Sequence, residues 1–122
     1  MKLRIRDNSI RVRLSKSEVD TLGKGAMVSN ELEFPGGKSI CFQLLGGNQF
    51  NAAFDEDTVR ITAPEETLRE WVASEELSLS QDLPVSSASS LWILIEKDLQ
   101  CKTDRPREED SEAIQNTVAN NS

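Results

Sequence analysis

The chain has 122 residues and a formal net charge of −7, with 37% hydrophobic and 5% aromatic residues. This length fits one domain with a modest, mainly aliphatic core. Histidine is absent, which excludes the commonest general base and every Ser-His or Cys-His catalytic pair. The longest apolar run, Leu91 to Ile95, is far shorter than the roughly 20 residues of a membrane-spanning helix, and the alternating start differs from a signal peptide. We therefore expect a cytoplasmic protein that makes no membrane contact.

Positive charge is concentrated in the first 13 residues, where apolar and basic side chains alternate in two short runs. A turn at Asp7-Asn8 between these runs predicts a hairpin that pairs Ile5 with Ile10 and Leu3 with Val12. The same register places five cations together on the opposite face. These are Lys2, Arg4, Arg6, Arg11 and Arg13.

The next signals predict a short helix and two further hairpins. Ser15 and Glu18 have the spacing of a capping box, and Gly23 stands where a left-handed residue would end the helix. Across Pro35-Gly36-Gly37-Lys38, the apolar parity pairs Phe34 with Ile40 and Leu32 with Phe42. A third hairpin brings Phe50, Ala52 and Phe54 against Val59 and Ile61.

The last elements are a second helix and a central strand. Pro64 at a first helical position, followed by Glu65 and Glu66, predicts a helix over Pro64 to Ala73. Leu77 and Leu79 indicate a short strand, Gln81 to Ser90 a polar loop, and Leu91 to Lys97 a buried strand. The expected core anchors are Phe34, Phe42, Phe50, Phe54, Trp71 and Trp92.

These elements predict an α+β domain over residues 1–102, followed by an acidic, partly disordered tail over residues 103–122. We expect a curved, mostly antiparallel sheet or open barrel of seven or eight strands with two short helices. We find no internal sequence repeat, although each half of the chain holds hairpins and one helix.

The five cations are the main candidate for a binding face. Arg4 beside Arg11 would be repulsive unless water, carboxylates or a bound anion relieved the charge. One interpretation is a solvated face paired with the protein's own carboxylates. The other is a docking face for a small anion or an acidic protein, to which the planar guanidinium is suited. Nucleic acid is a poor candidate because no helix-turn-helix, zinc module or exposed aromatic platform accompanies the cations.

A second charged group, Glu96, Lys97, Asp98 and Arg105, follows the last strand. Glu96 and Asp98 could contribute to a Mg²⁺ shell, but two carboxylates are an incomplete set, and an ion-pair cluster is the better interpretation. Cys41 and Cys101 are expected to be free thiols, their pairing being left open, and Cys101 has no base to activate it as a nucleophile. We predict no catalytic residue, metal site or cofactor.

The opening residues 1–19, together with Glu96-Lys97-Asp98-Leu99-Gln100-Cys101 and Glu109-Asp110, resemble a family of short bacterial proteins known only as a domain of unknown function. The resemblance implies a bacterial cytosolic protein and no catalytic activity. It also suggests that the two ends of the chain act as a pair. We hypothesise that residues 96–110 dock near Arg4, Arg6, Arg11 and Arg13, because their dominant charges are opposite.

The sequence therefore favours a small binding or interaction module that uses the basic strand face, with an acidic protein surface or a small anion as its partner. The alternative is a metal-dependent enzyme that acts on a phosphorylated or polyanionic substrate inside a barrel. Whether the cations face a cavity or solvent distinguishes the two. The sequence does not indicate an oligomeric state.

Overall fold

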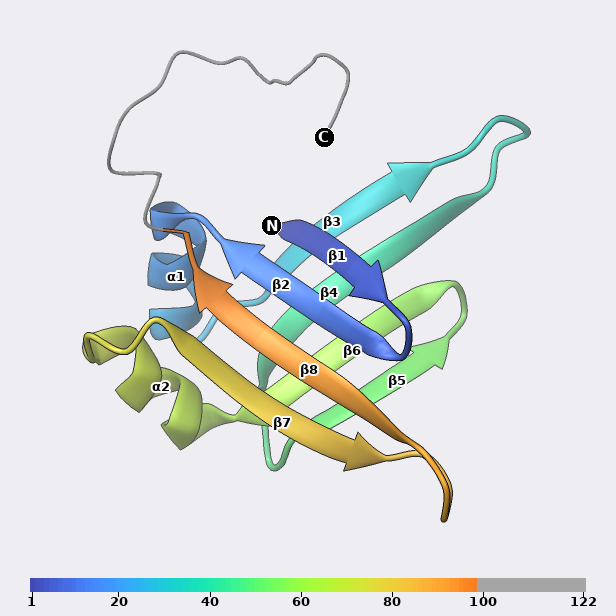
Figure 1. Ribbon diagram of the computed structural model, residues 1–122. Coiled ribbons are helices and arrows are strands. Elements are labelled where there is room, and N and C mark those ends of the chain that lie inside the picture. Colours follow the sequence, from blue (N-terminus) through green and yellow to red (C-terminus); the bar gives the residue numbers. More distant parts are fainter. Residues whose placement is uncertain (99–122) are drawn as a thin grey trace.

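The computed structural model describes residues 1–98, and within this range the chain forms eight strands and two helices (Figure 1). In chain order they are β1 (Lys2–Arg6), β2 (Ser9–Leu14), α1 (Lys16–Gly23), β3 (Val28–Glu33), β4 (Ser39–Gly47), β5 (Asn51–Asp55), β6 (Thr58–Pro64), α2 (Glu65–Ala73), β7 (Ser78–Pro84) and β8 (Ser90–Lys97). The α+β class, the number of strands and the two short helices agree with expectation. Neither helix of this segment has the length and apolar character that a bilayer crossing requires.

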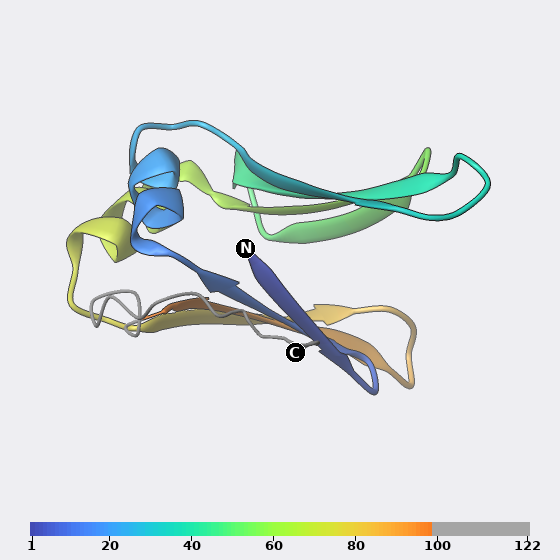
Figure 2. The same ribbon diagram turned by 90° about the horizontal axis from the view of Figure 1, so that it is seen from above.

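The strands form two four-stranded sheets, with the orders β1-β2-β8-β7 (sheet A) and β3-β4-β6-β5 (sheet B). Figure 2 shows the sheets as two layers, with both helices together at one end. The expectation of one mostly antiparallel sheet or open barrel is wrong. Each sheet is mixed, because its two central strands are parallel: β2 with β8, and β4 with β6. The helices make this possible, since α1 carries the chain from sheet A to sheet B and α2 carries it back.

The first hairpin has the predicted pairings, and the third brings together the predicted strands, although Phe50 precedes β5. Ile5 lies opposite Ile10 in the first, and Phe54 lies opposite Val59 in the third. The second hairpin is displaced from its predicted register by two residues, so that Leu32 faces Ile40 and Asn30 faces Phe42. The reason is a tighter turn: Gly36 and Gly37 both have positive φ, and the Phe34 N–H donates to the Lys38 carbonyl at 2.7 Å.

Each helix departs from expectation at one end. The capping box of α1 is confirmed: the Ser15 side chain accepts from the Glu18 N–H, and the Glu18 side chain accepts from the Ser15 N–H. Gly23, however, is helical, and the left-handed residue is Gly25, at φ +84. At the start of α2, Pro64 is the N-cap and not the first helical residue.

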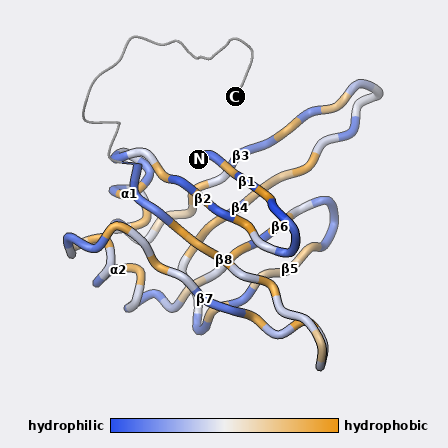
Figure 3. Tube along the Cα trace, viewed as in Figure 1, coloured by the Kyte–Doolittle hydropathy of each residue, from blue (hydrophilic) through white to orange (hydrophobic). Residues whose placement is uncertain are grey.

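The core lies between the two sheets and the helices. Val12, Leu14 and Ile95 of sheet A and Leu44 of sheet B are fully buried, and Trp71 of α2 is 4% exposed. The tube in Figure 3 shows β8 as mainly hydrophobic, in keeping with its central position in sheet A. Three predicted anchors are not core residues, since Phe34, Phe54 and Trp92 are 51%, 68% and 43% exposed. Phe34 and Phe54 lie near hairpin turns remote from the helices, and Trp92 has the outward parity of β8.

The segment predicted to be a loop over Gln81 to Ser90 is a strand as far as Pro84, since β7 extends over Ser78–Pro84. In this extended region Gln81 pairs with Ile93 and Leu83 pairs with Leu91. The polar residues between the leucines concealed the strand in the sequence. Pairing with β8 therefore outweighs the weak intrinsic strand propensity of these polar residues in the edge strand β7.

The two halves of the described chain have the same architecture. β1, β2 and α1 begin at residues 2, 9 and 16, and β5, β6 and α2 begin at residues 51, 58 and 65, so a constant offset of 49 relates them. Each half then continues with a hairpin in the opposite sheet. Buried positions also correspond: Val12 and Leu22 match Ile61 and Trp71. The structure thus contains an internal repeat that sequence comparison did not reveal.

Candidate functional site

All five cations of the first hairpin lie on the outer face of sheet A. Their neighbours in the same strands, such as Val12 and Leu14, are fully buried, and alternate residues of a strand point to opposite faces. The register places this outer face in three rows across β1, β2, β8 and β7. The rows are Lys2-Arg13-Glu96-Ser78, Arg4-Arg11-Leu94-Ser80 and Arg6-Ser9-Trp92-Asp82. We refer to Lys2, Arg4, Arg6, Arg11 and Arg13 as the basic face.

Glu96 of β8 is a carboxylate that adjoins the basic face. Arg11 donates to it through two nitrogens, Nε at 2.9 Å and Nη2 at 3.0 Å, and Arg13 donates to its Oε1 at 3.4 Å. The hydrogen bond from Arg11 is the largest cause that holds the pKa of Glu96 below its ordinary value, and the same pair raises the pKa of Arg11. Because β2 and β8 are parallel neighbours, Glu96 lies directly opposite Arg13. The two arginines of β2 are therefore neutralised in part from within the protein.

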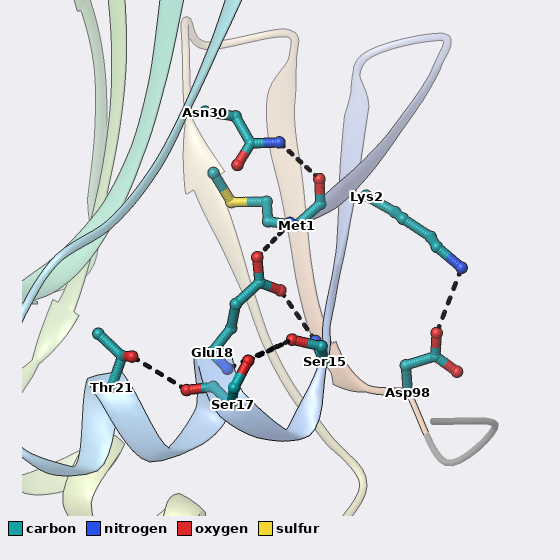
Figure 4. Close-up of polar contacts among 8 residues, drawn as sticks. All are labelled: Met1, Lys2, Ser15, Ser17, Glu18, Thr21, Asn30 and Asp98. Atoms are coloured by element: carbon teal, nitrogen blue, oxygen red, sulfur yellow. Dashed lines mark hydrogen bonds and ion pairs between the residues drawn. The ribbon is translucent and has the colours of Figure 1, made fainter. Parts of the chain in front are cut away.

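Asp98 pairs with a third cation, Lys2, at the corner of the face. Its carboxylate lies 3.4 Å from the Lys2 ammonium, as Figure 4 shows. The backbone there is fixed by a hydrogen bond from the Asp98 N–H to the Leu14 carbonyl at 2.8 Å. The chain therefore leaves the described structure beside the basic face.

Arg4 and Arg6 remain. Both are exposed residues of β1, and neither forms a salt bridge with a carboxylate within residues 1–98. Arg4 lies directly opposite Arg11, whose guanidinium is already directed to Glu96. The basic face thus has two parts. Lys2, Arg11 and Arg13 are paired with carboxylates, and Arg4 and Arg6 form no salt bridge within residues 1–98.

The N-terminus anchors this edge of sheet A to the rest of the protein (Figure 4). The Met1 ammonium pairs with the Glu18 carboxylate of α1, and the Met1 carbonyl accepts from Asn30 of β3 at 2.9 Å. Burial alone would raise the pKa of Glu18, but hydrogen bonds from the Met1 ammonium and the Ser15 N–H outweigh it, and the pKa falls below its ordinary value. β1 is thereby held against both α1 and sheet B.

Sheet B supplies an internal comparison for the basic face. With the offset of 49, the outward residues Lys2, Arg4 and Arg6 of β1 correspond to Asn51, Ala53 and Asp55 of β5, while Arg11 and Arg13 correspond to Arg60 and Thr62. Arg60 donates from Nε to the uncharged Gln43 side chain at 3.0 Å. The same framework is therefore built with one cation where sheet A has five. The strand framework of the repeat can thus form without a basic outer face.

The other predicted charged residues have separate positions. Lys97 donates to the carbonyls of Trp71 and Ser74 at 2.9 and 2.8 Å, and its ammonium lies 4.9 Å from the centroid of the Trp71 ring. It holds the C-terminal end of α2 and does not belong to the basic face. Arg105 and Cys101 lie outside the described residues. Of the hypothesis that residues 96–110 dock near the cations, the part concerning Glu96 and Asp98 agrees with these contacts, and residues 99–110 lie outside the described range.

Other candidate sites offer less. Cys41 has the outward parity opposite to Ile40 and Phe42, as predicted, and is partly exposed on sheet B. Within residues 1–98 no three potential metal ligands gather. Three surface hollows in this range, near the first turn of α2, the end of α1 and the turns of sheet B, include none of the five cations.

Sequence reasoning missed two residues of this surface. Trp92, 43% exposed, and Leu94 lie in the same rows as Arg6 and Arg4. Both belong to the apolar run of β8, which suggested burial on both sides. Their outward parity relative to the buried Ile93 and Ile95 was the available signal. An exposed aromatic residue, absent from the sequence-based expectation, thus adjoins the cations.

No curated protein and no solved structure matches the chain. A family model does match, over residues 1–118, and it carries the description "family of unknown function (DUF7009)". The match covers nearly the whole chain, as the resemblance at its two ends implied. The chain belongs to this family of unknown function.

Proposed function

We propose that the protein is a small binding module whose basic face docks an acidic segment of another protein, with Arg4 and Arg6 as the principal contacts. The observation that carries the proposal is the comparison with sheet B. The same strand framework there has Ala53 and Asp55 where sheet A has Arg4 and Arg6. Since folding does not demand these cations, their concentration on one face favours a role in recognition.

Edge protection is the main structural alternative, because charged side chains on an edge strand discourage unwanted pairing. It would account for the cations of β1, which is an edge strand of sheet A. It does not account for Arg11 and Arg13, because β2 is an interior strand. A face that continues across two strands supports docking better than edge protection.

The shape of the basic face favours a protein segment over a small anion. Rows of outward side chains along a strand are about 6.7 Å apart, and Arg4 and Arg6 belong to adjacent rows. Two guanidinium groups at this spacing suit successive carboxylates of an acidic chain. Leu94 and Trp92 lie in the same rows, on the far side of Arg11 and Ser9, and offer an apolar contact to a chain that crosses the strands.

The metal-dependent enzyme alternative assumed inward cations inside a barrel. In the described residues the sheets form an open two-layer arrangement, and the cations face outward. Glu96, which that alternative assigned to a metal, is engaged by Arg11 and Arg13. These contacts favour the binding module.

The test is the affinity of the full chain for a short poly-glutamate peptide, measured by calorimetry at low ionic strength. We expect binding that weakens as salt is raised, because exposed charges are screened beyond about 10 Å at 0.1 M salt. Arg4→Ser combined with Arg6→Ser should reduce the affinity about tenfold or more, which corresponds to about 1.4 kcal/mol. The matched control is Arg60→Ser with Arg69→Ser, which removes the same charge elsewhere and should leave most of the affinity intact.

A gain-of-binding variant makes use of the internal repeat. Asn51→Lys, Ala53→Arg and Asp55→Arg together give β5 the outward residues of β1, and we expect a second, weaker site for the peptide on sheet B.

Two outcomes would contradict the proposal. If the Arg4/Arg6 variant and the Arg60/Arg69 control lost equal affinity for the peptide, only net charge would matter, and the proposal would be refuted. Tighter binding of a single-stranded oligonucleotide than of a peptide of equal charge would refute the choice of an acidic protein as partner.

A further inference from the structure

The basic face lies beside the point where the chain leaves the described structure, and the sequence that follows is acidic. Asp98 contacts Lys2 at the corner of the face. Ten residues later the sequence reads Glu108-Glu109-Asp110-Ser111-Glu112, which has four carboxylates in five residues. We propose that this segment is the intramolecular ligand of Arg4 and Arg6, and that it competes with the external acidic partner inferred above.

The distances permit this contact. Arg6 lies four residues along β1 from Lys2, which is about 13 Å at the rise of a strand. Ten residue steps from Asp98 to Glu108 span about 33 Å when extended. An extended segment can therefore reach both arginines.

The charges also match. Glu96 and Asp98 already pair with three of the cations, Arg11, Arg13 and Lys2. The chain has thus begun to cover the basic face with its own carboxylates before the described residues end. Arg4 and Arg6 are the two cations left, and the acidic segment lies within reach of them.

Attachment favours the contact within one molecule. A ligand on a short tether is present at an effective concentration in the millimolar range, so a weak charge contact suffices to occupy the face much of the time. An external partner must displace the segment, and its apparent affinity falls by the fraction of molecules whose face is open. The acidic segment would therefore raise the threshold for binding. This competitive role rests on the proposed function, whereas the contact itself does not.

The test uses the full chain with the segment neutralised: Glu108→Gln, Glu109→Gln, Asp110→Asn and Glu112→Gln. The matched control neutralises four carboxylates on the β3 and β5–β6 side of sheet B: Glu33→Gln, Asp55→Asn, Glu56→Gln and Asp57→Asn. NMR signals of the Arg4 and Arg6 backbone amides and side-chain Nε groups report the contact. We expect these signals to shift in the neutralised variant and not in the control. The parent chain should show the same shift at 1 M salt, because charges are then screened beyond about 3 Å and the contact is weakened.

The affinity of the same variants for poly-glutamate tests whether the segment competes with an external ligand. If the segment covers the face two thirds of the time, its neutralisation raises the affinity for poly-glutamate about threefold, and the control changes it much less. Unchanged Arg4 and Arg6 signals in the neutralised variant would overturn the inference. So would a signal shift that appears only as protein concentration rises, because the contact would then join two molecules.

These outcomes separate the two proposals. Shifted arginine signals with no poly-glutamate binding in any variant would support the intramolecular contact and reject the proposed function. Poly-glutamate binding that depends on Arg4 and Arg6, but is the same with and without the segment's charges, would support the proposed function and reject the further inference.

Discussion

At the scale of single residues, two carboxylates determine how the N-terminal strands are held. Glu96 gathers Arg11 and Arg13 on the outer face of sheet A, and Glu18 receives the Met1 ammonium while it caps α1. Both have a pKa below the ordinary value of 4.5. A carboxyl group whose pKa is lower in the folded state stabilises the protein above its unfolded pKa, and this contribution is lost as the pH falls through the folded pKa.

Glu18→Gln tests this linkage. Gln keeps the capping geometry but not the charge, so the variant should be less stable at pH 7 by about 1 kcal/mol, within the range for a carboxylate at a helix N-terminus. The difference in unfolding free energy between parent and variant should shrink below pH 4.5 as Glu18 becomes protonated. Urea denaturation at pH 7, 5, 4 and 3, in protein with a free Met1 amine, measures it. A difference that is constant over this range would contradict the ion pair.

At the scale of elements, the strands and caps were predictable where the determining contacts are local. The Asp7-Asn8 turn and the alternation around it specify the first hairpin, and Ser15 with Glu18 specifies the start of α1. The second hairpin shows the limit. Its parity was right, but the adjacent positive-φ residues Gly36 and Gly37 closed a tighter turn, which shifted the strand pairing by two residues.

The interface between the helices explains Gly23 in a way the sequence could not. A Cβ atom on Gly23 would lie 2.9 Å from Cγ1 of Val72, so the glycine allows α1 and α2 to approach closely. Gly23 and Val72 are also equivalent positions of the internal repeat, related by the offset of 49. The residue acts in helix packing, while Gly25 provides the left-handed turn that follows.

A double-mutant cycle distinguishes packing from helix propensity. Gly23→Ala should destabilise the parent by about 1–3 kcal/mol, the usual range for overpacking. In a Val72→Ala background the clash is relieved, and the same change should be neutral or stabilising by up to about 1 kcal/mol, the propensity difference between glycine and alanine. Thermal unfolding of the four proteins measures the coupling. Equal effects in both backgrounds would show that Gly23 does not serve close packing.

At the scale of the whole molecule, the two halves of the described chain interleave. Each sheet combines one hairpin from each half, joined through the parallel pairs β2–β8 and β4–β6. Such pairs link residues far apart in sequence, such as Val12 and Ile95, and no local pattern indicates them. The sequence therefore predicted the strands but neither the two sheets nor the repeat.

The same long-range pairing assembles the candidate site. Sequence parity placed five cations on one face of a hairpin, and charge alone suggested that the segment from Glu96 onward would dock near them. The parallel contact between β2 and β8 is what brings Glu96, Leu94 and Trp92 beside the arginines. These neighbours could not be assigned without the strand order. Glu96 and Asp98 determine which cations are already compensated, and Arg4 and Arg6 are left without a salt bridge within residues 1–98.

The central claim is that the outer face of β1 and β2 is where an acidic chain binds, and NMR mapping tests it most directly. In a titration of the ¹⁵N-labelled full chain with a poly-glutamate peptide, we predict that the largest amide and arginine Nε shifts fall on residues 2–13 and 92–96 and diminish with salt. Arg4 and Arg6 should change most. Shifts centred on the outer face of sheet B, around Arg60, or spread evenly over the surface would contradict the account.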